Sequence, residues 1–348
     1  MTPLAAVLAI DGGGSKTDVA LVATDGSVLA SARGGASNHQ VVGRDVALAV
    51  LTALVHEVAT KAGRAVGAPL GAAPVAAHTA ACLAGADLPD EEAELTAVIT
   101  AQRWSGTATV VNDTFAVLRA GLDDDVPGPH WGIGVVCGHG TNCAGVAPDG
   151  RSFRFVALGA ISGDWGGGAD LGTEALWWAA RAEDGRGPDT ELRRAVPAHF
   201  GVSRVEDVII GVYRRTIDHA ELFGLTPVLL AVAGAGDEVA RSVVLRQADE
   251  VCAMVTVAAR NLGLGGDAPV PVVLGGSVLA ARDALLTDAI TERLTDRLPE
   301  AGIRIIDAPP VLGAALLGLD QAGTPAAALV RLRAAMERPA LAPQRASK

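Results

Sequence analysis

Residues Ala9 to Ser31 read AIDGGGSKTDVALVATDGSVLAS, with three consecutive glycines between two apolar segments. The apolar residues 7–10 and 18–24 form short runs on either side of the glycines, which is typical of β-strands. An Asp-Gly pair at 25–26 is typical of a tight hairpin turn, and residues 27–31 form a third predicted strand. The glycine loop is therefore predicted to join one strand to the next.

Two common phosphate-binding motifs do not fit this loop. A Walker A motif has glycine directly before its lysine and a helix after it, whereas here Ser15 precedes Lys16 and a strand follows. A dinucleotide-binding GxGxxG motif also opens a helix, and its third glycine is replaced by Thr17. What remains is a β-hairpin turn whose backbone N–H groups can approach phosphate, because glycine has no Cβ.

The polar residues around the glycines favour phosphate binding over a plain hairpin turn. Hydroxyl groups and a lysine can donate to phosphate oxygens, whereas Asp11 would repel phosphate unless a cation such as Mg²⁺ lay between them. We therefore predict that Asp11 contacts the metal and that the nucleotide is bound by Gly12, Gly13, Gly14, Ser15, Lys16 and Thr17.

The composition excludes several classes of protein. The chain has 348 residues, 50% of them hydrophobic, enough for two domains with apolar cores. A net charge of -11 and an aromatic content of 3% argue against a nucleic-acid partner. No apolar run reaches the about 18 residues of a membrane span, and the N-terminus lacks a basic signal region, so a cytoplasmic protein is expected. Buried or free thiols, without CxxC spacing, are expected for Cys82, Cys137, Cys143 and Cys252.

The order of predicted elements indicates an α/β protein. Strands and helices alternate in the first third of the chain, with a helix at 44–63, a strand at 74–80, a helix at 91–102 and a strand followed by a helix within 107–121. The acidic, Pro- and Gly-containing segment 123–130 is the best candidate boundary. We expect a first lobe at 1–122, completed by a C-terminal helix at about 311–335, and a second lobe at 123–310 with a helical insertion.

The second lobe begins with a weak repeat of the N-terminal pattern. Residues 131–155 again run strand, Gly-rich turn, strand, Asp-Gly turn and strand. Residues 171–264 are predicted to be mostly helical, with a capping box formed by Ser203 and Glu206. Two later strands are expected at the starts of 269–281 and 303–307, the first followed by a Gly-Gly turn and a helix.

Five motifs in this order resemble the N-acetylglucosamine and glucosamine kinases of the BadF/BadG/BcrA/BcrD-type ATPase family, within the actin–hexokinase–Hsp70 superfamily. The first is the opening stretch extended to GGASNH at residue 39. The others are VVNDTFAVLRAG (110–121), GVVCGHGTNCAGV (134–146), ISGDWGGGADLGT (161–173) and VVLGGSVL (272–279). The resemblance implies two actin-like (ribonuclease H-like) α/β lobes, with ATP and Mg²⁺ bound in a cleft between them.

The resemblance implies that Asp113 is the catalytic base, which accepts the proton of a sugar hydroxyl. Asp113 lies where an apolar strand gives way to a helix, the edge at which open α/β sheets bind their ligands. The alternative is that Asn112 or Asp113 is only a helix N-cap.

Other site residues also follow from the resemblance. The sugar is expected to contact Asn38, Asp113, Thr141, Asn142, Asp164 and Trp165. The phosphates are expected at Gly138, Gly140 and Thr141, and the adenosine at Gly275, Gly276 and Ser277. The alternatives are an Asx turn at Asn38, plain glycine turns at the two loops, and a buried aromatic residue at Trp165.

The sugar loop departs from the family pattern, because ADLGT has Leu171 where related kinases carry a glutamate. A changed specificity is therefore expected. The carboxylate of Asp164 and the acidic composition favour glucosamine, phosphorylated at its 6-hydroxyl, over N-acetylglucosamine or glucose. An ATPase activator of a radical dehydratase, with an iron–sulfur cluster, and a non-catalytic sugar sensor are the remaining alternatives. The oligomeric state stays open, with a homodimer among the options.

Overall fold

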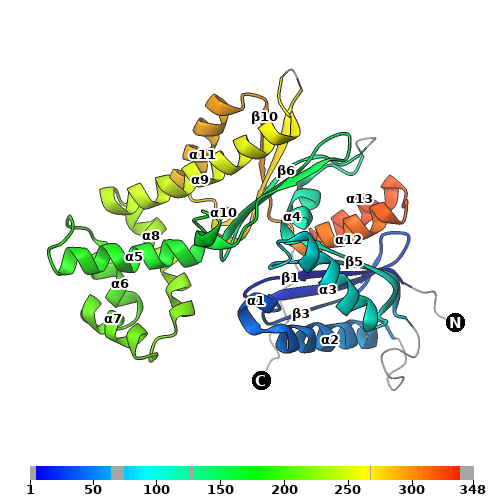
Figure 1. The fold of residues 1–348 in the computed structure, drawn as a ribbon, viewed down its shortest axis with the longest axis horizontal. Helices are drawn as coiled ribbons and strands as arrows, with labels where there is room; N and C mark the ends of the chain where they lie inside the picture. The colour runs from blue at the N-terminus through cyan, green and yellow to red at the C-terminus, as the bar shows by residue number, and fades with distance from the viewer. Residues whose placement is uncertain (1–4, 64–73, 126–128, 267, 338–348) are drawn as a thin grey trace, which may run out of the picture. The chain divides into compact units, whose positions relative to one another are not determined.

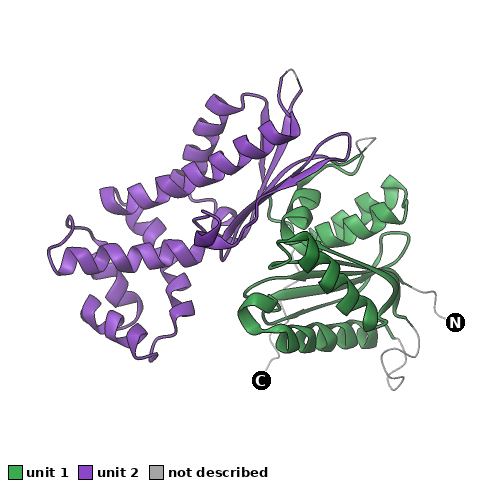
Figure 2. Ribbon diagram, in the orientation of Figure 1, with its two compact units in different colours: residues 1–130, 306–348 green, residues 131–305 purple. Residues whose placement is uncertain are grey.

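The computed structural model describes residues 5–63, 74–125, 129–266 and 268–337. The chain divides into two compact units, shown in Figure 2. Unit 1 contains residues 1–130 and 306–348, and unit 2 contains residues 131–305. Each unit is built on one five-stranded sheet.

The sheet of unit 1 has the strand order β3-β2-β1-β4-β5. Its strands are β1 (Ala5–Gly12), β2 (Thr17–Val22), β3 (Val28–Gly34), β4 (Ala76–Leu83) and β5 (Ser105–Asn112). The first three strands are antiparallel neighbours, whereas β1, β4 and β5 run parallel. The prediction that the glycine loop joins two strands is confirmed.

Both faces of this sheet are covered, which explains why β1 is apolar at nearly every position. Leu8 and Ile10 pack with residues of α2 (Arg44–Lys61) on one side. Val7 and Ala9 pack on the other side, with residues of three further helices, α4 (Asp113–Gly121), α12 (Pro310–Gln321) and α13 (Ala326–Met336). Short α1 (His39–Val42) precedes α2, and α3 (Pro89–Ala101) precedes β5 (Figure 1).

The closing segment predicted as one helix over about 311–335 forms two helices instead. α12 ends at Gln321, and Gly323 has a φ of +65°, a backbone conformation that favours glycine. Pro325 then precedes α13, as expected just beyond a helix end. Buried Arg119 of α4 forms ion pairs with Asp124 (2.8 Å) and with Asp320 of α12 (2.7 Å).

α12 approaches α4 so closely that only glycine fits at the contact. A Cβ built on Gly313 would lie 1.8 Å from the backbone oxygen of Ala116. We predict that Gly313→Ala lowers the free energy of unfolding by about 1–3 kcal/mol, measured by urea denaturation. Gly234→Ala, in the last turn of helix α8 (Leu225–Gly234), is the matched control, because no atom lies within 4 Å of its added Cβ. Equal stability of the two variants would contradict the prediction.

Unit 2 repeats the topology of unit 1, which confirms the internal repeat. Its sheet has the order β10-β9-β6-β7-β8. Again, three antiparallel neighbours (β8, β7, β6) continue into parallel strands (β9, β10). The bounds are β6 (Gly132–Cys137), β7 (Thr141–Val146), β8 (Ser152–Arg154), β9 (Val270–Gly275) and β10 (Ala301–Ile305).

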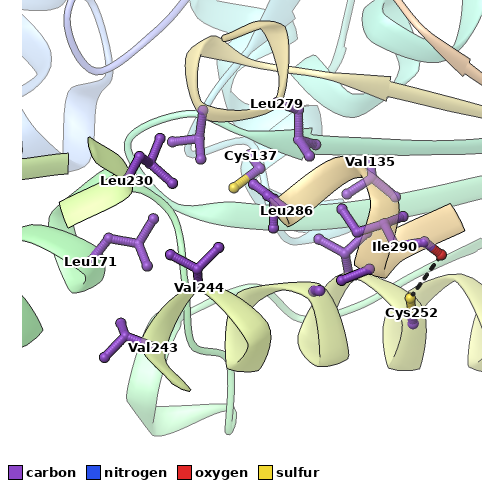
Figure 3. Close-up of a cluster of buried hydrophobic side chains, with 14 of the residues drawn as sticks. Val135, Cys137, Leu171, Leu230, Val243, Val244, Cys252, Leu279, Leu286 and Ile290 are labelled. Atoms are coloured by element: carbon purple, nitrogen blue, oxygen red, sulfur yellow. Dashed lines mark hydrogen bonds between the residues drawn. The ribbon is translucent and has the colours of Figure 1, made fainter. Parts of the chain in front are cut away.

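Most of the segment between β8 and β9 is helical, as predicted. It contains α5 (Gly168–Glu183), α6 (Leu192–His199), α7 (Val205–Tyr213), α8 and α9 (Glu238–Leu262), with 3-10 turns at Gly159–Ile161 and His219–Gly224. α10 (Ser277–Ala280) and α11 (Ala284–Arg297) follow β9. α9 packs along the sheet, and its buried face shares one core with α5, α8 and α11 (Figure 3).

The predicted capping box of Ser203 and Glu206 is wrong. The N-cap of α7 is Arg204, whose side chain makes no capping hydrogen bond. The amides of Val205 and Glu206 instead donate to the carboxylate of Glu183, at 3.0 and 3.1 Å. A distant side chain therefore caps this helix.

The four cysteines are free and buried, as predicted. Within the described ranges, no helix combines the length and the apolar character that a membrane crossing requires.

Candidate active site

Two aspartates lie at the carboxyl edge of the unit 1 sheet. Asp11 is the last residue but one of β1, and Asp113 directly follows β5. Because β1, β4 and β5 are parallel, both residues lie at the same edge, where α/β sheets bind ligands. Asn112 is the N-cap of α4, and its Oδ1 accepts a hydrogen bond from the Thr114 amide (3.0 Å). The capping role therefore belongs to Asn112.

Both aspartates have raised pKa values. Burial raises the pKa of Asp11 to about 8, with the negative charges of Asp113 and Asp18 acting in the same direction and Lys16 and Arg33 opposing them. Burial, followed by the charge of Asp87, raises the pKa of Asp113 to about 7. Negative charge is thus concentrated in a poorly solvated place, which favours a bound cation or a proton.

The residues around Asp11 fit a magnesium ion that is held mainly by phosphate and water. Asp11 and Asp18 are cross-strand partners, and Arg33 is hydrogen-bonded to Asp18 at 2.6 and 2.9 Å. The described part of the chain contains no group of three or more His, Cys, Asp or Glu residues that could hold a metal ion. Mg²⁺ commonly binds one or two carboxylates and keeps several waters, so one carboxylate suffices.

Asp87 is a candidate site residue that the sequence analysis did not identify. Its carboxylate accepts hydrogen bonds from Asn112 Nδ2 (2.8 Å) and Gln40 Nε2 (3.3 Å). Glu91 fixes the Asp87 backbone by accepting a hydrogen bond from its amide at 3.0 Å. Asp87 follows β4, which extends to Leu83 rather than to the predicted residue 80. A strand predicted to reach residue 83 would have placed Asp87 just beyond its carboxyl end, where ligand-binding residues are expected.

The first glycine hairpin is a tight turn that leaves two backbone amides available to a ligand. The Gly13 amide donates to the Lys16 carbonyl (2.9 Å), which closes the turn. A Cβ on Gly12 would lie 2.6 Å from side-chain atoms of both Leu83 and Ser37, so a larger residue there would displace them. Among the described residues, no acceptor within the chain is found for the amides at 14 and 15, and the side chains of residues 15–16 are exposed.

The Thr17 hydroxyl, predicted to donate to phosphate, instead points into the protein. Its side chain is completely buried, and Oγ1 donates to the Gly35 carbonyl at 2.7 Å. Oγ1 also lies 2.7 Å from Ser37 Oγ. The hydroxyl therefore fixes the segment after β3, and only the backbone of Thr17 borders the loop.

Asn38 lies near the Asp87 network. Its Oδ1 accepts a hydrogen bond from the Gln40 amide (2.9 Å), which is the Asx turn considered as the alternative. A Cβ on Gly85 would lie 2.7 Å from the same oxygen, so Asn38 packs over the loop that follows β4. Gln40 reaches the Gly85 carbonyl (3.2 Å) as well as Asp87, which ties Asn38 to this edge of the sheet.

The second glycine hairpin, in unit 2, packs on the N-terminus of α5. The Gly138 and His139 carbonyls accept hydrogen bonds from the amides of Gly168 (2.8 Å) and Ala169 (3.0 Å). Gly167 has a φ of +85°, and a Cβ there would lie 2.4 Å from the Gly140 backbone. In the described ranges the amides at 139 and 140 donate to no group of the chain, which makes them available to a ligand.

The Gly275-Gly276-Ser277 turn lies against the same hairpin. Gly276 has a φ of +92°, and a Cβ there would lie 2.4 Å from the Cys137 carbonyl oxygen. A Cβ on Gly138 would lie 4.0 Å from the Ser277 amide nitrogen. Two of the predicted nucleotide-binding segments are thus neighbours in unit 2.

The predicted sugar residues of unit 2 have several partners within the chain. Asp164 accepts a hydrogen bond from the Ser162 hydroxyl, and the Cys143 amide donates to Asn142 Oδ1 (2.7 Å). The Arg246 guanidinium lies 3.8 Å from the centre of the Trp165 ring, which also packs against the unit 2 core. Trp165 is thus partly buried, and one face of its ring is covered by a cation.

The structure accounts for the unusual ADLGT sequence. Asp170 accepts a hydrogen bond from the Gly166 amide at 2.8 Å and so stabilises the glycine turn. Leu171 is completely buried in the unit 2 core. The position at which related kinases carry a glutamate therefore supplies no carboxylate here.

Two repeated α/β units, each with a glycine hairpin after its first strand, define an actin-like ATPase fold. A structure of a candidate N-acetylglucosamine kinase from Chromobacterium violaceum aligns with a TM-score of 0.67 over 90% of this chain and 99% of that one, at 24% identity. This similarity concerns the fold. The chain belongs to the BadF/BadG/BcrA/BcrD ATPase family, whose model matches residues 8–318.

Two curated relatives are sugar kinases. An N-acetyl-D-glucosamine kinase of Dictyostelium discoideum is 25% identical over 315 residues, which cover 90% of this chain and 97% of the relative. An N-acetylmuramic acid/N-acetylglucosamine kinase of Clostridium acetobutylicum is 29% identical over 274 residues, which cover 78% and 85%.

Proposed function

We propose that this protein is an ATP-dependent kinase that transfers the γ-phosphoryl group to the 6-hydroxyl of an amino sugar. The observation that carries the proposal is the pair of aspartates, Asp11 and Asp113, at one carboxyl edge of a sheet whose first turn is a phosphate-type glycine hairpin. Membership of an ATPase family and relatedness to sugar kinases support it.

In this proposal Asp113 accepts the proton of the attacking sugar hydroxyl. The new bond forms between the sugar oxygen and the γ-phosphorus, while the bond from phosphorus to the bridging oxygen breaks and ADP leaves. A pKa of about 7 suits a general base that works near neutral pH. Asn112 caps α4 and is hydrogen-bonded to Asp87, so it fixes the direction from which Asp113 approaches the hydroxyl.

The two glycine hairpins would bind the phosphates through backbone amides. The Gly12–Lys16 turn contributes the amides at 14 and 15 and the lysine charge. The turn at 138–140 contributes two further amides, and Gly275, Gly276 and Ser277 border the adenosine. Asp11 would hold Mg²⁺, which would neutralise phosphate charge when bound.

Glucosamine is the sugar that the residues favour. Its ammonium group pairs well with a carboxylate such as that of Asp164. N-acetylglucosamine is the second candidate, because both curated relatives are named as kinases of that sugar. Asn38, Asn142 and Trp165 would contact the sugar in either case.

The two non-kinase alternatives have less support. A cluster shared between subunits needs cysteines at the surface, whereas Cys137 and Cys143 are completely buried in the unit 2 core. A sensor without catalysis would need no general base, whereas Asp113 is a carboxylate at the sheet edge where α/β proteins bind their ligands.

A screen of sugar acceptors tests the proposed function. Purified protein with MgATP is expected to release ADP at least about tenfold faster with glucosamine than with N-acetylglucosamine or glucose, which lack the ammonium group. A tenfold preference corresponds to about 1.4 kcal/mol, within the range of one ionic contact. A coupled ADP assay measures the rates. A preference for N-acetylglucosamine would replace glucosamine by the second candidate, whereas no sugar-dependent ADP release would contradict the kinase itself.

A further inference from the structure

Gln247 is a completely buried polar residue on a helix face that is otherwise apolar. The other buried residues of α9 are alanine, valine, leucine, methionine and cysteine. A buried amide group destabilises a protein unless it is hydrogen-bonded, and leucine or methionine would fill this position of the helix equally well. The glutamine therefore requires an explanation.

The side chain of Gln247 bridges two turns that are far apart in the sequence. Its Oε1 accepts a hydrogen bond from the Gly167 amide at 2.7 Å, in a buried place. Its Nε2 donates to Thr141 Oγ1 at 3.3 Å. A Cβ on Gly166 would lie 2.5 Å from Oε1, so the glycine turn closes directly over the glutamine.

The two hydrogen bonds of the Gln247 side chain stabilise the second glycine hairpin. Thr141 is the first residue of β7, directly after the turn at 138–140. Gly167 packs against the Gly140 backbone. One amide thus holds both the strand that leaves the hairpin and the turn that supports its tip. Because Nε2 donates to Thr141 Oγ1, the hydroxyl proton of Thr141 points elsewhere, either to Cys137 Sγ (3.4 Å) or to a ligand.

We propose that Gln247 is a positioning residue, which holds the 138–141 hairpin in the geometry that binds the terminal phosphates of ATP. This inference rests on the proposed function. Gln247 itself does not touch the nucleotide, since it is buried beneath the two turns. Replacing the Gln247 side chain should therefore weaken the binding of the β- and γ-phosphates and leave the binding of adenosine and its α-phosphate unchanged.

The test compares a triphosphate with a monophosphate. Gln247→Met keeps the volume of the side chain and removes both hydrogen bonds. We expect the Kd for a non-hydrolysable ATP analogue with Mg²⁺ to rise at least about tenfold by calorimetry, which corresponds to about 1.4 kcal/mol, because the hairpin is no longer held in its binding geometry. The Kd for AMP should stay within about twofold. Val251→Ala, one turn along the buried face of α9, is the control for general destabilisation and should change neither Kd.

Hydrogen exchange provides a readout that needs no nucleotide. In Gln247→Met the Gly167 amide should exchange faster, whereas Val251→Ala should leave it protected. Unchanged exchange, or an equal loss of affinity for AMP and the triphosphate, would overturn the positioning role. If the wild-type protein bound no triphosphate, the proposed function would fail, and so would the role of Gln247 in ATP binding. The exchange result would still decide whether Gln247 holds the two turns.

Discussion

Asp113→Asn is expected to lower kcat by about 10²–10⁴-fold, because the amide cannot accept the hydroxyl proton. The change is nearly isosteric, and Asn112 still caps α4, so the fold and nucleotide affinity should be preserved. Steady-state ADP release and calorimetric titration with an ATP analogue measure the two quantities. Asp90→Asn, an exposed carboxylate in the first turn of α3, is the matched control and should retain full activity.

The pH profile adds a second criterion for Asp113. Because burial raises its pKa to about 7, the carboxylate of the ligand-free enzyme is half protonated near neutral pH. The wild-type kcat/KM should therefore rise as the pH increases through about 7, and the residual activity of Asp113→Asn should lack this rise. Full turnover of the variant, or an identical pH profile, would remove Asp113 from the base role.

Asp11→Asn is expected to stabilise the ligand-free protein at alkaline pH. The folded pKa of Asp11 is about 8, above the unfolded value near 3.8, so the folded state holds the extra proton between these values. Stability of the wild type therefore falls as the pH rises from about 4 to about 8. Asparagine removes this dependence, and the gain in the free energy of unfolding should reach about 2–5 kcal/mol at pH 9.

Urea denaturation at pH 5 and pH 9 without Mg²⁺ measures this effect. The gain from Asp11→Asn should be small at pH 5, only about one unit above the unfolded pKa, and should be clearly larger at pH 9. Asp25→Asn, at an exposed carboxylate in the β2–β3 turn, is the control and should not show a gain that grows with pH. Asp11→Asn should also lose the activation of ADP release by Mg²⁺. A variant less stable than wild type at pH 9 would contradict the raised pKa.

The architecture around the first hairpin could be predicted because it depends on neighbours in the sequence. The glycines, the apolar runs beside them and the Asp-Gly pair specify β1, β2 and β3 without reference to the rest of the chain. The strand-to-helix junction at Asp113 is equally local. The closing segment is predicted as one helix because its apolar pattern is nearly continuous. Gly323 and Pro325 interrupt it, and two helices form instead.

The side-chain partners in the site could not be predicted, because they depend on contacts across long sequence separations. Thr17 turns inward to residues 35–37, which adjoin it only once β2 and β3 pair. Asp87 is linked to Asn112 across two parallel strands. Gln247 reaches Thr141, more than a hundred residues away, and belongs to a helix whose pattern is otherwise apolar. Local patterns specify the elements, and tertiary packing decides which polar groups meet.

The most direct test of the central claim is to measure, by ³¹P NMR, how much sugar phosphate forms for each ADP. The protein is incubated with MgATP and either glucosamine or N-acetylglucosamine. We predict one phosphate monoester on the 6-hydroxyl of an amino sugar for each ADP formed, and formation of that ester at least about a hundredfold more slowly with Asp113→Asn. ADP accompanied by inorganic phosphate alone, or a phosphorylated sugar formed equally well by Asp113→Asn, would contradict it.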